Sequence, residues 1–535
     1  MSRVHLHAAF CLATFLPSCA IAQSLGATGT TAQNEAARAP SASSTGSVPS
    51  NRTRSTFHIY NPAGKITQVR VTAPPQTIPS VVWPSENSEL PSERVNTPLN
   101  QIYFGKEWVP PLPHPEAILT DPFGWNTWLR DRGVAIMMDT TNEFSGAITS
   151  PTPGYGLRQG SSNAGQYSLE NDIDWEKLAN VRGFSTHALV VGRYGIPASR
   201  MFGDNLNPSS EIYGAGGNVV VHLVYAYAEE TIAKGRVDLA GGRIPFLNDF
   251  SSSPLYCTFQ NNAFCGNPKA SSDNLSHSSY PDASWAFRVR TRPTISTYIQ
   301  TGVYFAQAGI YGNTQYRTGF KFNGADIHGE AIPVEAGWEP LFGKDKLPGH
   351  YKVGYAFDNA PHKDNYYDRN GQPYVISGLP ARVLNYSWSA WALADQMVLR
   401  HHVRGNTDAG LILMGGMYAN SPRTQLRGQQ YFAGLLDSGF WPSRPLDTIG
   451  INFSYVRVSK TATQTERLQA LYGMPLMGGS LTPQTFGEVL EAIYRIHVMR
   501  GVTFAPDFQY FFRPGAQKAL KDAAMLGFKS HIQFF

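Results

Sequence analysis

The sequence is poor in cysteine, in charge and in long apolar runs. Of its 535 residues only four are cysteine, and charged residues make up 16%. After the first 22 residues, no run of about 18 or more uncharged apolar residues occurs, which argues against membrane-spanning helices. A formal charge of +5 from dispersed basic residues is weak for a nucleic-acid binder of this length. These deficits disfavour a helical membrane protein and a nucleic-acid partner.

Motifs for catalysis and for cofactor binding are also missing. The chain contains neither G-x-S-x-G nor H-E-x-x-H, two common hydrolase motifs. The glycines of YGAGGNV (213–219) do not match the dinucleotide-binding spacing and lead into a predicted strand. His187, His222 and His497 occur singly on separate predicted strands, which favours hydrogen-bonded histidine over a metal site. We therefore expect no enzyme activity, no cofactor and no metal.

The N-terminus has the pattern of a secretory signal peptide. Arg3 precedes an apolar core over residues 8–16, and Ala20-Ile21-Ala22 forms a small-residue cleavage site. This pattern predicts removal of residues 1–22 and export of the mature chain. Lipid attachment at Cys19 is the alternative interpretation.

Export leaves Cys257 and Cys265 as the cysteines of the mature chain. In an oxidising compartment a close pair predicts one structural disulfide, which would close the loop CTFQNNAFC. The pair offers too few ligands for a metal site, and its spacing is not C-x-x-C.

Residues 23–115 differ in composition from the rest of the chain. Alanine, serine, threonine and proline dominate, and no apolar periodicity is sustained. A segment that buries little apolar surface cannot offset its chain entropy, so we expect a largely disordered periplasmic linker. Alternatively, this region packs on the main domain and forms a small strand pair within residues 57–73.

From residue 116 onward, apolar and polar side chains alternate with a period of two. In GINFSYV, for example, Ile451 and Phe453 share one face while Asn452 and Ser454 share the other. The 50 glycines and 12% aromatic residues suit many strands joined by turns. At about 10 residues per strand plus connections, this part of the chain accommodates about 16 antiparallel strands. The exception is DWEKLAN (174–180), which predicts a short helix.

A membrane barrel explains this all-β pattern better than a soluble β-domain, which remains the alternative. The polar faces are rich in charge and glycine, whereas tyrosine, tryptophan and phenylalanine lie near strand ends like aromatic girdles. The exported chain also ends in a predicted strand that closes on Phe535, as bacterial outer-membrane barrels do. Its apolar row contains Leu526, Phe528 and Ile532, and Phe535 falls on the opposite face. We predict a transmembrane antiparallel β-barrel with a polar, water-filled lumen in the bacterial outer membrane.

The stretch WAFRVRTR (285–292) shows the two predicted faces most clearly. One row consists of Trp285, Phe287 and Val289, and the other consists of Arg288, Arg290 and Arg292. In a membrane barrel the apolar row would face lipid and the arginines would face the lumen.

Two longer segments resemble the carbohydrate-selective porin family OprB. They are AGGRIPFLNDF (240–250) and PLYCTFQNNAFCGNP (254–268), and similar phrases occur in 280–294, 391–400 and 444–459. The resemblance runs from about residue 116 to the C-terminus. It implies a channel of 16 antiparallel strands that passes glucose and related sugars without a cofactor.

Sugar passage requires weak and repeated contacts in the lumen. Arginine donors and carboxylate acceptors are suitable partners for sugar hydroxyls. The candidate contact residues are Arg236, Asp238, Arg243, Arg288, Arg290, Arg292, Glu335, Glu339, Glu491 and Arg495. The alternative is that these charges only solvate the wall and pair with one another across strands.

Three functions stay open at this point. The first is a sugar-permeable porin, and the second is an anion-preferring porin for sugar acids, because an arginine row concentrates anions. The third is a surface-binding barrel with a plugged lumen. The expected partners are sugars as permeants, outer-membrane lipid and lipopolysaccharide, the barrel-assembly machinery acting on the C-terminal strand that ends at Phe535, and further copies of the chain in a homo-oligomer.

Overall fold

A computed structural model describes most of the chain beyond residue 112. The described residues are 112, 115–212, 220–233, 235–265, 268–272, 280–294, 296–307, 318–406 and 408–535, together with the backbone of two short strands, β1 (Ile59–Tyr60) and β2 (Ile66–Thr67). The chain divides into two units, residues 1–73 and 74–535, and each is described by itself. In the first unit, β1 and β2 pair antiparallel. The predicted signal peptide and nearly all of the predicted linker lie outside the described residues.

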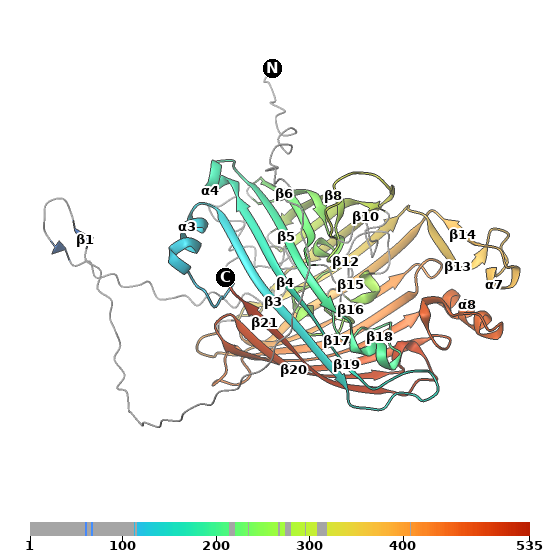
Figure 1. Cartoon of the computed structure of the whole chain (residues 1–535). Coiled ribbons are helices and arrows are strands. Elements are labelled where there is room, and N and C mark those ends of the chain that lie inside the picture. Colours follow the sequence, from blue (N-terminus) through green and yellow to red (C-terminus); the bar gives the residue numbers. More distant parts are fainter. Residues whose placement is uncertain are drawn as a thin grey trace, which may run out of the picture. The chain divides into compact units, whose positions relative to one another are not determined.

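The second unit is a closed antiparallel barrel of sixteen long strands, which confirms the predicted fold (Figure 1). The strands are β3 (Val134–Ala147), β4 (Ser161–Asp174), β5 (Phe184–Gly195), β6 (His222–Ile232), β7 (Val237–Ile244), β8 (Ser284–Thr294), β9 (Thr297–Gln307), β10 (Ile327–Trp338), β12 (Leu347–Asp358), β15 (Ser387–Arg400), β16 (Gly410–Asn420), β17 (Arg427–Ser438), β18 (Thr448–Val458), β19 (Phe486–Met499), β20 (Val502–Phe512) and β21 (Ala523–Gln533). Consecutive long strands pair with each other, and β21 pairs with β3 to close the sheet. The two-residue strand β11 (Leu341–Phe342) adds to the edge of β12.

The two ends of the barrel carry connections of different length. The end where β21 terminates, called the turn end here, carries the short connections 175–183, 233–236, 295–296, 339–346, 401–409, 439–447 and 500–501, and the lead-in 115–133. The opposite end, called the loop end, carries 148–160, 196–221, 245–283, 308–326, 359–386, 421–426, 459–485 and 513–522. Outer-membrane barrels have short periplasmic turns and longer extracellular loops.

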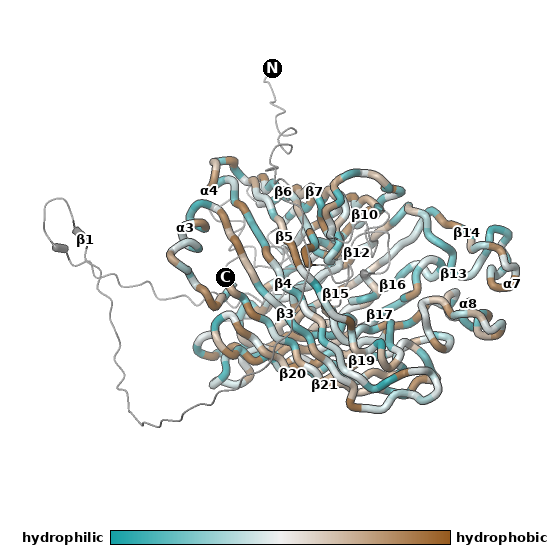
Figure 2. The backbone as a smooth tube through the Cα atoms, in the orientation of Figure 1, coloured by the Kyte–Doolittle hydropathy of each residue, from teal (hydrophilic) through white to brown (hydrophobic). Residues whose placement is uncertain are grey.

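Side chains alternate between the two faces of the barrel wall, as the period of two predicts. On β8, Phe287 is 50% exposed on the outer face, whereas its neighbour Arg288 is 2% exposed on the inner face. On β21, Leu526 is exposed while Lys529 and His531 are buried on the inner face. The same change of character from residue to residue is visible as alternating brown and teal along the strands in Figure 2.

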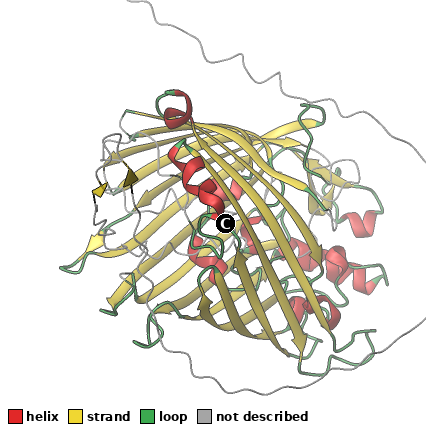
Figure 3. Ribbon diagram, turned by 60° about the vertical axis from the view of Figure 1, so that its left-hand side comes forward, coloured by secondary structure: helices red, strands yellow, loops and turns green. Residues whose placement is uncertain are grey.

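The helices lie in the connections rather than in the barrel wall (Figure 3). The predicted short helix is α4 (Trp175–Ala179), whose N-terminus is capped by the Asp174 carboxylate. The sequence did not predict η1 (Pro122–Gly124), α3 (Trp125–Asp131), η2 (Ala198–Phe202), α5 (Phe246–Asp249), η3 (Pro254–Thr258), α6 (Lys269–Ser272), α7 (Tyr374–Ser377), α8 (Lys460–Leu471), η4 (Met477–Gly479) or η5 (Pro514–Ala516). Most of these are single turns, too short for a helical period to be recognised. Among the described residues, no helix is long and apolar enough to cross a membrane.

A small projection lies at the loop end, outside the barrel sheet (Figure 1). Its two-stranded sheet consists of β13 (His362–Asp368) and β14 (Ala381–Leu384), and α7 and α8 pack beside β13. We call the connections 359–386, 421–426 and 459–485 together the outer projection.

Candidate functional site in the barrel interior

The described residues of the longest connection at the loop end (245–265, 268–272 and 280–283) fold into the barrel and are called the inner loop here. Its phenylalanines Phe246, Phe250, Phe259 and Phe264 are each no more than 1% exposed, although a loop of this length usually lies on the surface. They belong to one apolar cluster with inward-facing aromatic residues of the wall, such as Tyr304. The inner loop therefore occupies part of the lumen.

Arg288 is the centre of an ion cluster between the wall and the inner loop. Its guanidinium bonds Asp238 on β7 and lies 3.2 Å from a Glu229 carboxylate oxygen on β6. Asp249, at the end of helix α5 in the inner loop, is 3.4 Å from the same guanidinium. All four side chains are buried, so each charge depends on its neighbours for compensation. One arginine thus joins two strands to the inner loop.

The other two arginines of the row also have protein partners. Arg290 donates from Nε to the Gln300 side chain at 2.8 Å and lies 3.8 Å from Asp249. Arg292, nearer the turn end, forms an ion pair of 3.1 Å with Glu339. The whole row faces inward and is 2–5% exposed.

Glu335 on β10 is a second buried point of attachment. Its carboxylate accepts hydrogen bonds from Tyr298 Oη at 2.8 Å, Gln300 Nε2 at 2.9 Å and Trp391 Nε1 at 2.7 Å. It also accepts one from the backbone N–H of Ser251 in the inner loop, at 2.9 Å. Three strands therefore converge on one carboxylate that fixes the start of the inner loop.

On another part of the wall, Glu491 holds the middle of the inner loop. Its two carboxylate oxygens accept the backbone N–H groups of Gln260 at 2.5 Å and Asn261 at 3.1 Å. The Asn261 side chain in turn donates to Gln509 on β20 at 2.8 Å. A buried carboxyl group bonded to two consecutive backbone donors makes this an anchor for the loop.

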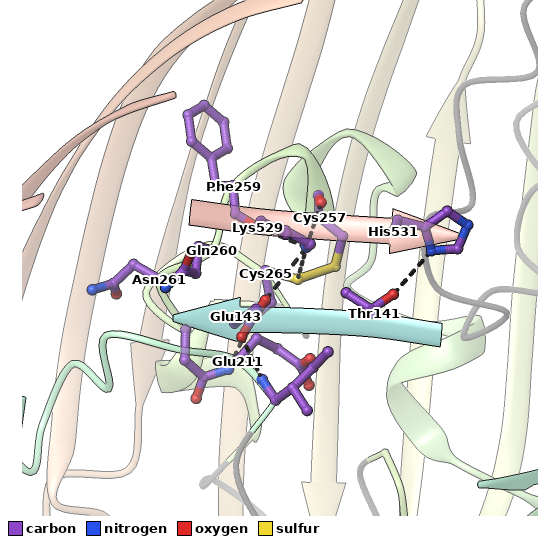
Figure 4. A network of polar contacts seen from close by, with 12 residues as sticks. Thr141, Glu143, Glu211, Cys257, Phe259, Gln260, Asn261, Cys265, Lys529 and His531 are labelled. Carbon is purple, nitrogen blue, oxygen red and sulfur yellow. Dashed lines mark hydrogen bonds and ion pairs between the residues drawn. A yellow bond between two sulfur atoms is a disulfide. The ribbon is translucent and has the colours of Figure 1, made fainter. Parts of the chain in front are cut away.

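Lys529 on β21 anchors the disulfide-closed part of the same loop (Figure 4). Its ammonium group donates to the carbonyl oxygens of Cys257 at 2.9 Å and Phe259 at 3.1 Å. The Glu143 carboxylate on β3 is 3.5 Å from that ammonium group. Cys257 and Cys265 form the expected disulfide.

Arg243 and Asp282 lie where the inner loop leaves and rejoins the wall. Arg243 donates to the carbonyl oxygens of Lys321, at 2.6 Å, and of Ala283. Asp282 lies 3.4 Å from His222 at the start of β6. Burial raises the pKa of Asp282 to about 7, against the opposing effect of nearby arginines. This carboxyl group therefore titrates near neutral pH.

The ten predicted contact residues do not form a single cluster. Arg288, Asp238, Arg290 and Glu335 gather around the start of the inner loop, while Arg292 and Glu339 pair near the turn end. Glu491 holds the middle of the loop, and Arg243 lies at its edge. Arg495 is buried on β19 and donates to Thr448 at 3.2 Å. Arg236 is exposed at the turn end and donates to the Pro293 carbonyl oxygen at 3.3 Å.

Sequence reasoning did not single out several residues of these clusters. Asp249 lies within AGGRIPFLNDF, so that segment offered a signal for it. Lys529 was not predicted as a site residue, because the carbonyl oxygens that it binds, at Cys257 and Phe259, are 272 and 270 residues away in sequence. Glu229 and Trp391 belong to the site because of which strands lie beside one another. Alternation along a strand specifies its faces but not its neighbours.

The arginine row and its acidic partners nearly cancel in charge. Three arginines face the four carboxylates of Glu229, Asp238, Asp249 and Glu339 at ion-pair distances of 3.8 Å or less. Opposite charges this close reduce the net electrostatic field in the lumen.

Comparison with known proteins places this barrel in a family. The family model described as "Carbohydrate-selective porin, OprB family" matches residues 158–534. The chain belongs to the OprB family. This membership agrees with the resemblance noted in the sequence, and it makes the protein an outer-membrane channel with a sugar-porin role rather than an enzyme.

Individual relatives match most of the chain. Porin B of Pseudomonas aeruginosa is 27% identical over 432 residues, which are 79% of this chain and 92% of the relative. A putative porin, QuiX, of Acinetobacter baylyi is 26% identical over 411 residues, or 74% of this chain and 88% of the relative. The high-pH structure of Pseudomonas putida OprB superimposes with a TM-score of 0.71 at 26% identity, covering 79% of this chain and 99% of that one.

Proposed function

We propose that this OprB-family porin passes uncharged sugars such as glucose through a polar channel lined by arginine and carboxylate side chains and narrowed by the inner loop. Sugars would exchange hydrogen bonds with accessible polar groups of the wall and of the inner loop. Such contacts are individually weak, so a permeant can enter and also leave.

The pairing of three arginines with four carboxylates is the observation that supports an uncharged permeant. An unpaired arginine row would concentrate anions, as the sugar-acid hypothesis requires. Here the carboxylates of Glu229, Asp238 and Asp249 surround Arg288, and Glu339 neutralises Arg292. The near balance of charge favours sugars over sugar acids.

Liposome swelling tests the proposal. We expect vesicles containing the protein to swell faster in glucose than in a non-sugar solute of equal size. Arg290→Gln should change the rate of swelling in glucose. Lys346→Gln, a substitution at an exposed position of the turn end, should leave that rate unchanged. Equal rates for both solutes would remove sugar selectivity, and no swelling would favour the plugged-barrel hypothesis.

A reversal-potential measurement separates the two channel hypotheses. In a salt gradient across a planar bilayer, we expect little preference between small anions and cations. A strong anion preference would instead support transport of sugar acids.

Three further predictions concern partners. The outward apolar rows would contact outer-membrane lipid, and the strand that ends at Phe535 would be recognised by the barrel-assembly machinery. Association with further copies of the chain is also a prediction, and crosslinking in native membranes would test it.

A further inference from the structure

The loop end of the barrel carries a strong excess of basic side chains. Among the described residues of its connections, twelve basic side chains are exposed or half-buried: Arg158, Arg200, Lys269, Lys363, Arg369, Arg382, Arg423, Lys460, Arg467, Arg513, Lys518 and Lys521. The corresponding acidic side chains are Asp326 and Asp522. Seven other acidic residues of these connections are buried: Asp204, Glu211, Asp249, Asp282, Asp364, Asp368 and Glu466. The two signs are therefore separated, with the acids inside.

The turn end shows that this separation is not a general property of the barrel. Its connections expose or half-bury ten basic residues in the described part of the chain: Arg130, Arg132, Lys177, Arg182, Arg236, Lys344, Lys346, Arg404, Arg444 and Arg500. They also carry seven acidic ones: Glu116, Asp121, Asp131, Glu176, Glu339, Asp345 and Asp408. Mixed charge of this kind is the usual state of a protein surface.

The separation of charge is most pronounced in the outer projection, because its acidic side chains are buried and bond to other residues of the projection. The buried carboxylate of Asp364 accepts from Arg382 Nε at 2.8 Å and from Arg423 Nε at 3.1 Å. Both guanidinium groups also lie over the Tyr367 ring, at 5.2 and 5.8 Å from its centroid. One carboxylate thus orients two arginines that remain about 30% exposed.

The projection is held together well enough to present a fixed surface. Thr465 on α8 donates to the Asn365 carbonyl oxygen at 2.5 Å, and the Asn365 N–H donates to the Arg423 carbonyl oxygen at 2.6 Å. Glu466 accepts the N–H of Gln484 at 2.6 Å. These bonds connect all three segments of the projection.

Exposed apolar side chains accompany the basic ones. Ile376, Val383, Leu471 and Tyr472 are 56–76% exposed on the same projection. A small hydrophilic anion would gain nothing from them, whereas an amphiphile with phosphate groups matches both features. In an outer-membrane porin, the long loops lie on the side of the outer leaflet, where such an amphiphile is available.

We propose that the outer projection is a docking surface for the phosphate groups of lipopolysaccharide. Lys363, Lys460 and Arg467 would approach the phosphates from β13 and α8, and Arg382 and Arg423 would contribute their remaining donors. Arginine is suited to bidentate phosphate recognition, and lysine contributes a compact charge.

Binding of purified lipid A to the full-length protein in detergent tests the proposal. The variant K363Q/K460Q/R467Q removes three exposed charges from the projection. Its matched control, K344Q/K346Q/R404Q, removes the same residue types from exposed positions at the turn end. We expect the first variant to bind diphosphoryl lipid A at least about tenfold more weakly, because each basic residue near an anionic lipid surface contributes several-fold. The control should bind within about twofold of the unaltered protein, by the same estimate.

Several outcomes would overturn the proposal. They are unchanged binding in the first variant, equal loss in the control, and equal binding of dephosphorylated lipid A. If the first variant alters anion conductance while lipid A binding is unchanged, the basic residues serve permeants and not lipid. Retained heat-modifiable migration of each variant in electrophoresis would establish that the barrel is folded.

Discussion

The inner loop and the outer projection are two loop-end structures that use buried carboxylates in opposite ways. In the inner loop, both signs are buried together, so Arg288 is surrounded by Asp238, Glu229 and Asp249. In the outer projection, Asp364 is buried while Arg382 and Arg423 stay partly exposed. The first arrangement cancels charge inside the barrel, and the second leaves basic side chains at the surface.

The comparison shows that burial, and not composition, decides the field around a charged cluster. Both regions contain arginines bonded to aspartate. The two regions differ in which partner remains in contact with water. Exposed charge acts over about a Debye length of 8–10 Å, so the exposed partner decides the field outside the cluster. The following substitutions test this contrast, from the largest expected effect to the smallest, and a pH dependence follows them.

Replacing Arg288 by methionine should have the largest effect. Three buried carboxylates would lose their shared cation, and breaking a buried ion pair costs about 3–5 kcal/mol. We expect a lower unfolding temperature in detergent and a shift toward cation preference in planar bilayers. Unchanged reversal potential would show that the cluster does not influence the permeation path.

Glu335→Gln removes a charge but nearly preserves size. The carboxylate accepts four hydrogen bonds, including those from Trp391 and Ser251, and bonds to a charged group contribute about 1.5–3 kcal/mol each. We expect destabilisation of about 2–3 kcal/mol, concentrated in the inner loop. Hydrogen exchange of residues 245–265 should increase, while exchange of the outer projection should not.

Asp364→Asn is the matching change in the outer projection. The amide can still accept from a backbone N–H, but it no longer neutralises Arg382 and Arg423. We expect a local loss of about 1–2 kcal/mol, seen as faster proteolysis within residues 359–386. Single-channel conductance should stay unchanged, and a changed conductance would contradict the separation between the two regions.

A separate effect is a pH dependence from Asp282. Burial raises its pKa to about 7 from an ordinary value of 3.8, so the folded state holds an extra proton between these values. Its contribution to stability is therefore fully present below about pH 4 and is lost as the pH rises through about 7. We expect the unfolding temperature to fall between pH 5 and pH 8, and Asp282→Asn to reduce that change.

Much of the wall could be predicted because strand faces repeat every two residues. In WAFRVRTR, Phe287 could be assigned to the outside and Arg288 to the inside from two premises alone. These are the alternation of side chains along a strand and an apolar environment around the barrel. The short helix at 174–180 could be predicted from its capping Asp174. Helix α8 was not predicted, because it lies in a connection where the strand period gives no information. The inner loop had a family-like sequence, but its path into the lumen depends on contacts such as Glu491 with Gln260, 231 residues apart.

By itself, the sequence determined the strand alternation, the exported barrel class and the disulfide pair, because each follows from local spacing or composition. Only the tertiary structure decided which charges meet. Antiparallel pairing places β6 beside β7 and β7 beside β8, and the inner loop returns to these strands, so Glu229, Asp238 and Asp249 reach one arginine. The physical reason is that charge compensation depends on distances of a few ångströms in space, which separation along the chain does not reveal.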